Sequence, residues 1–390
     1  MLKKVFALTL ALLMALSMVA CSSSSSSSKN ESTKTETETP VEDGNIVADP
    51  KYPDSGVLNG VCAYSAGGGA DNITRQVGML MSEYLKCASN VVNVTGGSGS
   101  VAGLNVLETG KDGYTCWGGV MPAPSSWHVL GFVEGSQWSD WYHFIAGEAY
   151  LGFYVNKDSN ITSMDELIAA ANANPGTLKW GHSGIGTAVN LSAEMLLKAV
   201  GISDKVVSVP YGGGREAATN LIAGEIDFQC AFISDIPDFL SSGDLVCIGT
   251  NVEGGIEWQK NDGTSYHIPD LNGEYPDACN NSRALGIYGV SLPRYVEPEK
   301  VQAFKEAFEY AVNTDEFKDF MAGLNQGAIC VTGVEADKMM SEAESVYAWA
   351  LYDAGLNAEG KSPEDLGIPR IEDYDYSKVD YSDIAPWPNA

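Results

Sequence analysis

A two-lobed α/β fold is the architecture that this sequence predicts. Strand-like and helix-like segments alternate along most of the chain, which is typical of α/β proteins. The chain has 390 residues, and its folded part exceeds the size at which one hydrophobic core usually stops growing, so we expect two lobes. Two glycine-rich segments, one in each expected lobe, each lie between a strand and a helix.

The N-terminus has the order of a secretory signal. Two lysines precede an apolar run from Val5 to Leu16, and small residues follow. This order predicts a signal peptide over residues 1–20, because the run is too short to be a membrane span. Small residues directly before Cys21 resemble the lipobox of bacterial lipoproteins, which predicts lipidation of Cys21. The alternative is an ordinary signal cleavage in which Cys21 has no role.

A flexible tether is expected over residues 21–55. Seven consecutive serines, Ser22 to Ser28, are followed by a stretch rich in Glu, Thr and Lys. Such a composition buries too little apolar surface to fold. The globular part is therefore expected to begin at Gly56.

The charge of the chain restricts its partners. The formal net charge is −28, which disfavours nucleic acid and anionic lipid surfaces because both are densely negative. An anionic ligand would therefore need local donors such as backbone amides. The eight cysteines form no C-x-x-C pair, and the histidines are not spaced as metal ligands, so we predict no metal and no cofactor.

The expected elements of the first lobe begin after the tether. An apolar stripe at helical spacing, carried by Val77, Leu80, Met81, Tyr84 and Leu85, predicts a helix that packs on a sheet. A second helix is expected to run through Leu107. The expected strands cover residues 57–63, 91–94 and 114–117.

The second lobe is expected to follow an apolar crossover at residues 144–155. Its predicted helices cover residues 164–173, 189–200 and 216–223, and its predicted strands cover 178–180, 206–209, 226–230 and 245–248. A loose insertion over 251–281, a strand over 284–290 and C-terminal helices would complete the first lobe. The predicted lobes are therefore 56–148 with 250–390, and 149–249, with hinges at 144–155 and 245–250.

The two glycine-rich segments have the features of anion-binding loops. Tyr64–Asp71 and Gly181–Thr187 each follow a predicted strand and open a predicted helix. Glycine allows close approach of the backbone to a ligand, and the first amides of a helix have no partner within it. The pair predicts two facing sets of oriented donors.

An ordered set of motifs resembles one protein family along nearly all of the folded chain. The set begins with the 64–71 loop, a helix carrying Arg75, and Gly96–Gly99. Its further members are Asp112–Thr115, Asn174–Leu178, Ser183–Gly186, Val209–Gly214, Ala223–Asp227 and Ser242–Leu245. In this order they are similar to the substrate-binding proteins of tripartite tricarboxylate transporters.

The resemblance implies a type II periplasmic-binding (Venus-flytrap) fold with a ligand in the cleft between lobes. It implies a monomeric extracytoplasmic receptor, without enzymatic activity, that captures a mono-, di- or tricarboxylate and delivers it to membrane permease subunits. Amides of Gly68, Gly69 and Ala70 would bind one carboxylate, and Ser183 and Thr187 with the amides of 184–186 would bind the other end. The expected site residues are Ser65, Ala66, Gly67, Gly68, Gly69, Ala70, Asp71, Ser183, Gly184, Ile185, Gly186, Thr187, Gly213 and Asp235.

The chain departs from the family pattern at two places. Family members commonly have prolines in the first loop, where this chain has Ser65 and Ala66. The insertion at 251–281 is long and lies near the expected rim of the cleft. Both departures bear on which solute is bound.

Three of the expected site residues have two interpretations each. Asp71 either accepts a hydrogen bond from a ligand ammonium, hydroxyl or water, or caps the helix and pairs with Arg75 one turn on; both roles are compatible. Gly213 belongs to a third glycine loop, which contacts the ligand or forms a plain turn. Asp235 follows a predicted strand and either lines the cleft or lies outside it.

Two other function classes remain open. Gly181–Ile185 begins like the Gly-x-Ser-x-Gly elbow of a serine hydrolase with Ser183 as nucleophile, but Ile185 replaces the final glycine. The downstream histidine would have to be His267. The third class is a surface adhesin, in which the glycine loops are turns alone.

Overall fold

The computed structural model describes residues 41–42 and 45–389. The expected signal peptide, the lipidation site Cys21 and the tether up to residue 40 lie outside the described residues. The described part begins with two short paired strands, β1 (Val41–Glu42) and β2 (Asn45–Ile46). In these ranges we find no helix with the length and apolar character needed to cross a bilayer.

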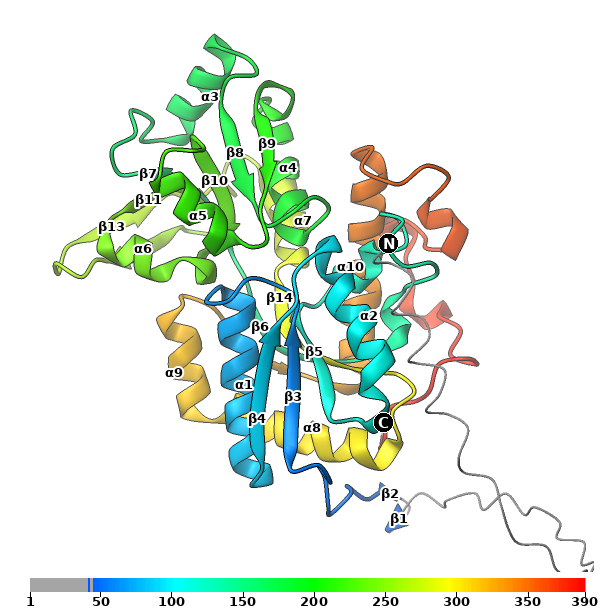
Figure 1. Ribbon diagram of the computed structural model, residues 1–390. Coiled ribbons are helices and arrows are strands. Elements are labelled where there is room, and N and C mark those ends of the chain that lie inside the picture. The colour runs from blue at the N-terminus through cyan, green and yellow to red at the C-terminus, as the bar shows by residue number, and fades with distance from the viewer. Residues whose placement is uncertain (1–40, 43–44, 390) are drawn as a thin grey trace, which may run out of the picture. The chain divides into compact units, whose positions relative to one another are not determined.

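The first of two large sheets has the strand order β15-β6-β14-β5-β3-β4 (Figure 1). Strand β3 pairs in parallel with β4 and β5, whereas β14 pairs antiparallel with β5 and β6. The strands are β3 (Val57–Cys62), β4 (Ala88–Asn93), β5 (Thr115–Val120), β6 (Trp141–Glu148), β14 (Ile287–Pro293) and β15 (Ala328–Val331).

Helices cover this sheet as the apolar periodicity predicts. Helix α1 (Gly69–Leu85) buries Val77, Leu80 and Met81 and packs against α8. Tyr84 was expected on the buried stripe, but it is 43% exposed and stacks on Tyr310 with ring centroids 4.9 Å apart. Helices α2 (Ser100–Thr109), α8 (Pro298–Asn313) and α10 (Gly333–Asp353) follow other strands of this sheet, and α9 (Asp315–Gly323) follows α8.

The second sheet has the order β11-β7-β10-β8-β9. Strand β8 pairs in parallel with β9 and β10, and β7 runs antiparallel to β10 and β11. Its strands are β7 (Leu151–Asn156), β8 (Lys179–His182), β9 (Val207–Pro210), β10 (Phe228–Phe232) and β11 (Leu245–Thr250). The helices between them are α3 (Met164–Ala173), α4 (Ala188–Ala199), α5 (Gly214–Ile222) and α6 (Pro237–Ser242). The two sheets give the two-lobed α/β architecture that the sequence predicts.

The segment expected to be a loose insertion is partly regular. It contains a hairpin of β12 (Ile256–Gln259) and β13 (Ser265–Ile268), followed by α7 (Pro276–Leu285). The strand expected from residue 284 begins at Ile287 instead, because Pro276 starts a helix that runs through Leu285. Helix α7 packs against α4, in the expected second lobe, and against α10, in the expected first lobe. The lobe boundary at residue 250 therefore stays a prediction.

A buried ion pair fixes the C-terminal segment to the first sheet. Arg294, at the end of β14, donates two hydrogen bonds to Asp337 of α10, at 3.0 and 2.7 Å. Asp337 also accepts from the indole of Trp387 at 2.9 Å, and Arg294 donates to the carbonyl of Ala385 at 2.7 Å. Both charged side chains are buried, so each depends on the other for its charge partner.

Replacing Arg294 with Met is expected to lower the free energy of unfolding by about 3–5 kcal/mol, because Asp337 would be left as an unpaired buried charge. Urea denaturation followed by circular dichroism measures the change. Arg370→Met is the matched control, since Arg370 pairs with the half-exposed Asp353 and should cost less than about 1 kcal/mol. Equal effects of the two variants would contradict the assignment.

A buried acid on α10 predicts a pH-dependent stability. Glu344 accepts a hydrogen bond from the Trp138 amide at 2.9 Å. Burial raises its pKa to about 8, although the Trp138 bond opposes this shift. A raised pKa in the folded state means that protonation stabilises the fold, and this stabilisation is lost as the pH rises from about 5 to 8.

The Glu344→Gln variant should therefore lose less stability than the wild type between pH 5 and pH 8. The effect of Glu344 is expected to reach at most about 1.4 kcal/mol per pH unit. Urea titrations at several pH values measure it. Parallel stability profiles for the two proteins would show that Glu344 ionises normally.

Candidate functional site

Three helix N-termini meet at one small cavity. The cavity lies beyond the carboxyl ends of β3, β8 and β9, beside the loops that lead from these strands into α1, α4 and α5. Its volume is about 20 Å³, enough for about one water molecule. The residues that line it are Tyr64, Ser65, Gly68, Ala70, Val120, Ser183, Thr187, Ala188, Val189, Gly213, Gly214, Phe232, Asp235 and Tyr288. Since the first amides of a helix lack intrahelical acceptors, this arrangement favours negative charge in the cavity.

Asp71 holds the first glycine loop in shape. One carboxylate oxygen accepts from the Gly67 amide at 2.8 Å, and the other accepts from Arg75 at 2.9 Å and Asn93 at 2.8 Å. Burial raises the pKa of Asp71, but these hydrogen bonds outweigh it and hold the pKa below its usual value. The expected pairing with Arg75 is present. Asp71 lies in the first turn of α1, whose N-cap is Gly68. It therefore supports the loop from within the helix and is not itself the N-cap residue.

The second loop is organised by its own side chains. Thr187 is the N-cap of α4 and accepts from the Asn190 amide at 3.2 Å. Asn190 in turn accepts from the Gly186 amide at 2.9 Å, and the Ser183 and Thr187 hydroxyls lie 3.1 Å apart. These bonds fix the loop while leaving the Ser183 and Thr187 side chains on the cavity wall.

The third loop approaches the first closely. A Cβ on Gly213 would lie 2.0 Å from the Ser65 hydroxyl oxygen, and a Cβ on Gly214 would lie 2.3 Å from Asp235 Oδ2. No larger side chain fits either position without movement of its neighbours. Glycine is required here by space, since Gly213 is extended, with φ of 177°.

Asp235 places a carboxylate at the N-terminus of α1. Its Oδ1 accepts from the Gly69 amide at 2.8 Å, across 166 positions of sequence. Burial raises the pKa of Asp235 to about 6, against the lowering effect of the Gly69 bond. The first amide of α1 is thus already bonded to an anionic group of the chain itself.

Further contacts join the two halves of the site. The Gly186 carbonyl accepts from the hydroxyls of Ser98, at 3.0 Å, and Tyr347, at 2.7 Å. The Ser234 hydroxyl lies 3.0 Å from that of Tyr288. Elements of the first lobe therefore contact the loops of the second directly, and the site is closed.

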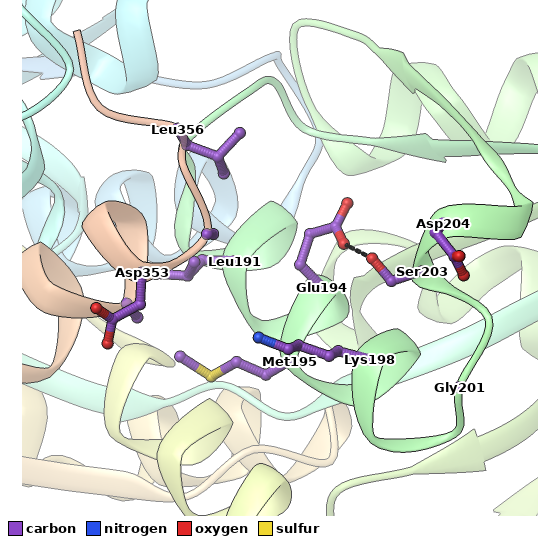
Figure 2. Close-up of a pocket in the computed structure, with 11 residues that line it drawn as sticks. Leu191, Glu194, Met195, Lys198, Gly201, Ser203, Asp204, Asp353 and Leu356 are labelled. Atoms are coloured by element: carbon purple, nitrogen blue, oxygen red, sulfur yellow. Dashed lines mark hydrogen bonds between the residues drawn. The ribbon is translucent and has the colours of Figure 1, made fainter. Parts of the chain in front are cut away.

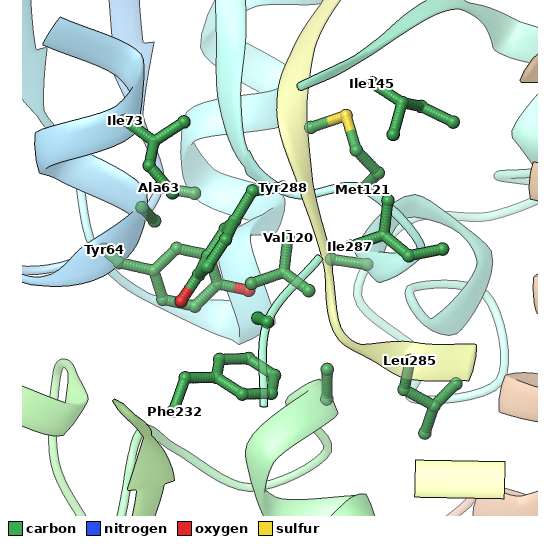
Figure 3. Packing of buried hydrophobic residues seen from close by; sticks show 14 of the residues in the cluster. Ala63, Tyr64, Ile73, Val120, Met121, Ile145, Phe232, Leu285, Ile287 and Tyr288 are labelled. Carbon is green, nitrogen blue, oxygen red and sulfur yellow. The ribbon is translucent and has the colours of Figure 1, made fainter. Parts of the chain in front are cut away.

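Aromatic side chains form the apolar wall of the cavity. Tyr64, Tyr288 and Phe232 lie together beside Val120 (Figure 3), with the rings of Phe232 and Tyr288 edge to face at 5.7 Å. The Tyr64 hydroxyl is buried and has no hydrogen-bond partner among the described residues. A buried hydroxyl without a partner is costly, so a polar atom of a ligand or water is expected there.

The structure brings half of the predicted site residues to the cavity. Those on its wall are Ser65, Gly68, Ala70, Ser183, Thr187, Gly213 and Asp235. Gly69 faces Asp235, whereas Asp71, Gly67, Gly184 and Gly186 shape the loops behind the wall. Ala66 and Ile185 are exposed, Ile185 to 53%, because both lie at the outer tips of their loops.

Sequence reasoning missed the residues flanking the loops. Phe232 ends β10 and Tyr288 lies on the central strand β14. Tyr64, two residues after β3, begins the predicted loop but was not among the expected site residues. A search of the residues at the carboxyl ends of all predicted parallel strands could have found Tyr64. Tyr288 gave no such signal, since it lies on β14, which pairs antiparallel with both of its neighbours.

The contacts of Ser183 do not support a hydrolase. Its hydroxyl bonds with Thr187, whereas His267 bonds with Glu257 at 2.7 Å. A nucleophilic serine needs a base within hydrogen-bond reach. Within the described ranges, we also find no group of three His, Cys, Asp or Glu side chains that could hold a metal ion.

A larger cavity of about 650 Å³ lies between α4 and α10 (Figure 2). Three of its lining residues are acidic, namely Glu194, Asp204 and Asp353, against one basic residue, Lys198, and none of the glycine loops lines it. It also lies along the side of α4 and away from the N-terminus of that helix. The small cavity, with its oriented amides, is therefore the candidate site for an anion.

The fold is that of two-lobed periplasmic binding proteins of known structure. Among solved structures, the periplasmic binding protein BugD has a TM-score of 0.66 at 17% identity, and the comparison covers 77% of this chain and 98% of BugD. Rpa4515 of R. palustris, solved with adipate, has a TM-score of 0.65 at 19% identity, with 76% and 97% covered. MatC of Rhodopseudomonas palustris, solved with bound malate, has a TM-score of 0.62 at 17% identity, with 75% and 98% covered.

The chain belongs to the family described as "Tripartite tricarboxylate transporter family receptor", whose model matches residues 73–344. A UPF0065 protein from the gbd 5' region of Cupriavidus necator is 26% identical over 278 residues, which cover 67% of this chain and 76% of the relative. A UPF0065 protein of Agrobacterium vitis, from the TAR-I ttuE-ttuC' intergenic region, is 31% identical over 186 residues, which cover 47% of this chain and 52% of the relative. The family resemblance seen in the sequence is confirmed.

Substituting Gly69 by Ala is expected to keep the two lobes apart. A Cβ at this position would lie 2.4 Å from the hydroxyl oxygen of Ser234, which belongs to the other lobe, and this clash exists only when the site is closed. The Tyr288 hydroxyl oxygen, 2.7 Å from the same Cβ, belongs to the lobe of Gly69 and would have to shift in the open and the closed form alike. Small-angle scattering should show a larger radius of gyration than for the wild type, and the overpacking should cost about 1–3 kcal/mol. Gly323→Ala on α9, where a Cβ meets open space, is the control. Identical scattering of Gly69→Ala and wild type would contradict a closed site at Gly69.

Proposed function

We propose that this protein is an extracytoplasmic receptor that captures a small organic carboxylate and performs no chemistry on it. The observation that carries the proposal is the convergence of α1, α4 and α5 on one cavity with the buried, unpartnered hydroxyl of Tyr64. Helix N-termini offer several donors to one anion without a positively charged side chain. The family and the neighbours solved with adipate and malate support the same class of ligand.

Capture in this cavity requires the lobes to open first. A volume of about 20 Å³ is too small for a carboxylic acid of several carbons. Opening separates the Gly69 amide from Asp235 and frees the N-terminus of α1. Closure around the ligand then satisfies donors from both lobes together.

The proposal extends to the place and the partner of the receptor. A lipid on Cys21 and the tether up to residue 55 would hold the folded part near the membrane. From there, the loaded receptor would deliver its ligand to the permease subunits of a tripartite transporter. The family to which the chain belongs supports this role.

A thermal-shift panel tests ligand capture on the purified mature chain. Mono-, di- and tricarboxylates are compared with sugars at equal ionic strength, and at least one carboxylate should raise the melting temperature. A ligand at 100 times its Kd stabilises the folded state by about 2.7 kcal/mol. A panel in which no carboxylate acts while an uncharged solute does would overturn the proposal.

The variant Tyr64→Phe links such binding to this cavity. It removes one hydroxyl and should weaken the best carboxylate about tenfold without lowering the stability of the unliganded protein, since the hydroxyl has no partner there. Tyr84→Phe, on the exposed side of α1, is the matched control and should bind as the wild type does. Unchanged binding by Tyr64→Phe would place the ligand elsewhere.

A further inference from the structure

We infer that the ligand of this receptor carries a protonated amine beside its carboxylate, and that Asp235 binds the amine. This inference rests on the proposed capture of a carboxylate in the cavity at α1, α4 and α5. It narrows the substrate class from carboxylic acids in general to amino acids and similar zwitterions.

The first support is the charge of the cavity wall. Among the residues that line the cavity in the described part of the chain, Asp235 is the one ionisable acid, and there is no Lys, Arg or His. The positive charge at the cavity comes from the helix N-termini, each of which is equivalent to roughly half an elementary charge. One carboxylate of the protein therefore offsets much of the attraction that an entering anion would feel. A zwitterion brings its own positive charge and restores the balance.

The second support is the position of the Asp235 carboxylate. Its Oδ1 accepts from the Gly69 amide at 2.8 Å, and its Oδ2 lies against Gly214, at the start of α5. The carboxylate thus lies between the N-termini of two of the three helices. A ligand carboxylate that binds at either helix comes to lie beside Asp235, where like charges repel each other in a poorly solvated site.

A cationic group between the two carboxylates removes this repulsion. An ammonium has three N–H donors and no acceptor. One N–H can donate to Asp235, while the others donate to acceptors on the side of the ligand. The neighbouring positive charge of the protein is already paired: Arg215 donates two hydrogen bonds to Asp238, at 2.8 and 2.7 Å. Burial raises the pKa of Asp235 and the attraction of Arg215 opposes this rise, but the hydrogen bonds of Arg215 go to Asp238, so the Asp235 carboxylate can accept from the ligand.

The apolar wall completes the expected ligand. Phe232, Tyr288 and Val120 also line the cavity (Figure 3). They offer contact to a carbon skeleton, whereas the amides of α1 and α4 and the carboxylate of Asp235 bond the charged groups. Each part of an amino acid thus has a complementary surface.

Pairs of ligands that differ only by the amine test the inference. Isothermal titration at pH 8 compares acetate with glycine, succinate with aspartate, glutarate with glutamate and phenylpropionate with phenylalanine. For the skeleton that binds best, the wild type should bind the amino acid at least tenfold more tightly than the acid without the amine. In Asp235→Asn, this preference should fall at least tenfold.

Asp238→Asn is the matched control. Asp238 lies three residues further on, is about half exposed and pairs with Arg215 outside the cavity, so its variant should keep the preference. Asp235→Ser is a second neutral variant, used with Asp235→Asn, and melting curves of the unliganded proteins establish which variants fold.

Each other outcome has a distinct meaning. If the wild type binds the acid without the amine as tightly as the amino acid, the inference is wrong, while carboxylate capture stands. If the neutral variants gain affinity for simple carboxylates and the wild type shows no preference for an amine, Asp235 is a resident competitor of the ligand, and the inference is again overturned. If no acid binds with or without an amine, carboxylate capture itself fails.

Discussion

The hydrogen bond from the Gly69 amide to Asp235 is the interaction on which the arrangement of the site depends. It connects the first turn of α1, in one lobe, to the segment after β10, in the other. Gly69 has no side chain to keep Ser234 away, so the two lobes can approach until this bond forms. The Ser98 and Tyr347 hydroxyls bond the Gly186 carbonyl and add a second contact between the lobes. A donor that lacks an intrahelical partner thus becomes the contact between lobes.

The sequence predicted this fold well where local patterns dominate. The parallel arrangement of β3, β4 and β5 follows from helices α1 and α2 placed between strands. The glycine loops before α1 and α4 were identified because a strand, glycines and a helix follow one another in both. Even at these loops, the sequence could not distinguish Gly68, on the cavity wall, from Ile185 at the exposed tip, because that depends on how each loop turns.

The remaining part of the site depends on long-range contacts that no local pattern encodes. Tyr288 reaches the cavity because β14 inserts between β5 and β6, and a sequence pattern does not give strand order. Asp235 was one of the predicted site residues, but its partner across 166 positions depends on lobe closure. The helix at 276–285 was missed because its polar composition resembles a loop, whereas packing against α4 and α10 stabilises it.

Asp235 also changes how the closed state is understood. In a receptor with an empty cavity, the free amides of α1, α4 and α5 would favour an open form in which water bonds them. Here Asp235 supplies an acceptor to α1 from within the chain. Opening exposes this carboxylate together with the amides, so an entering solute meets donors and an acceptor in the same place. Selection in this cleft is therefore decided by both signs of charge, although the described wall carries a single carboxylate and no basic side chain.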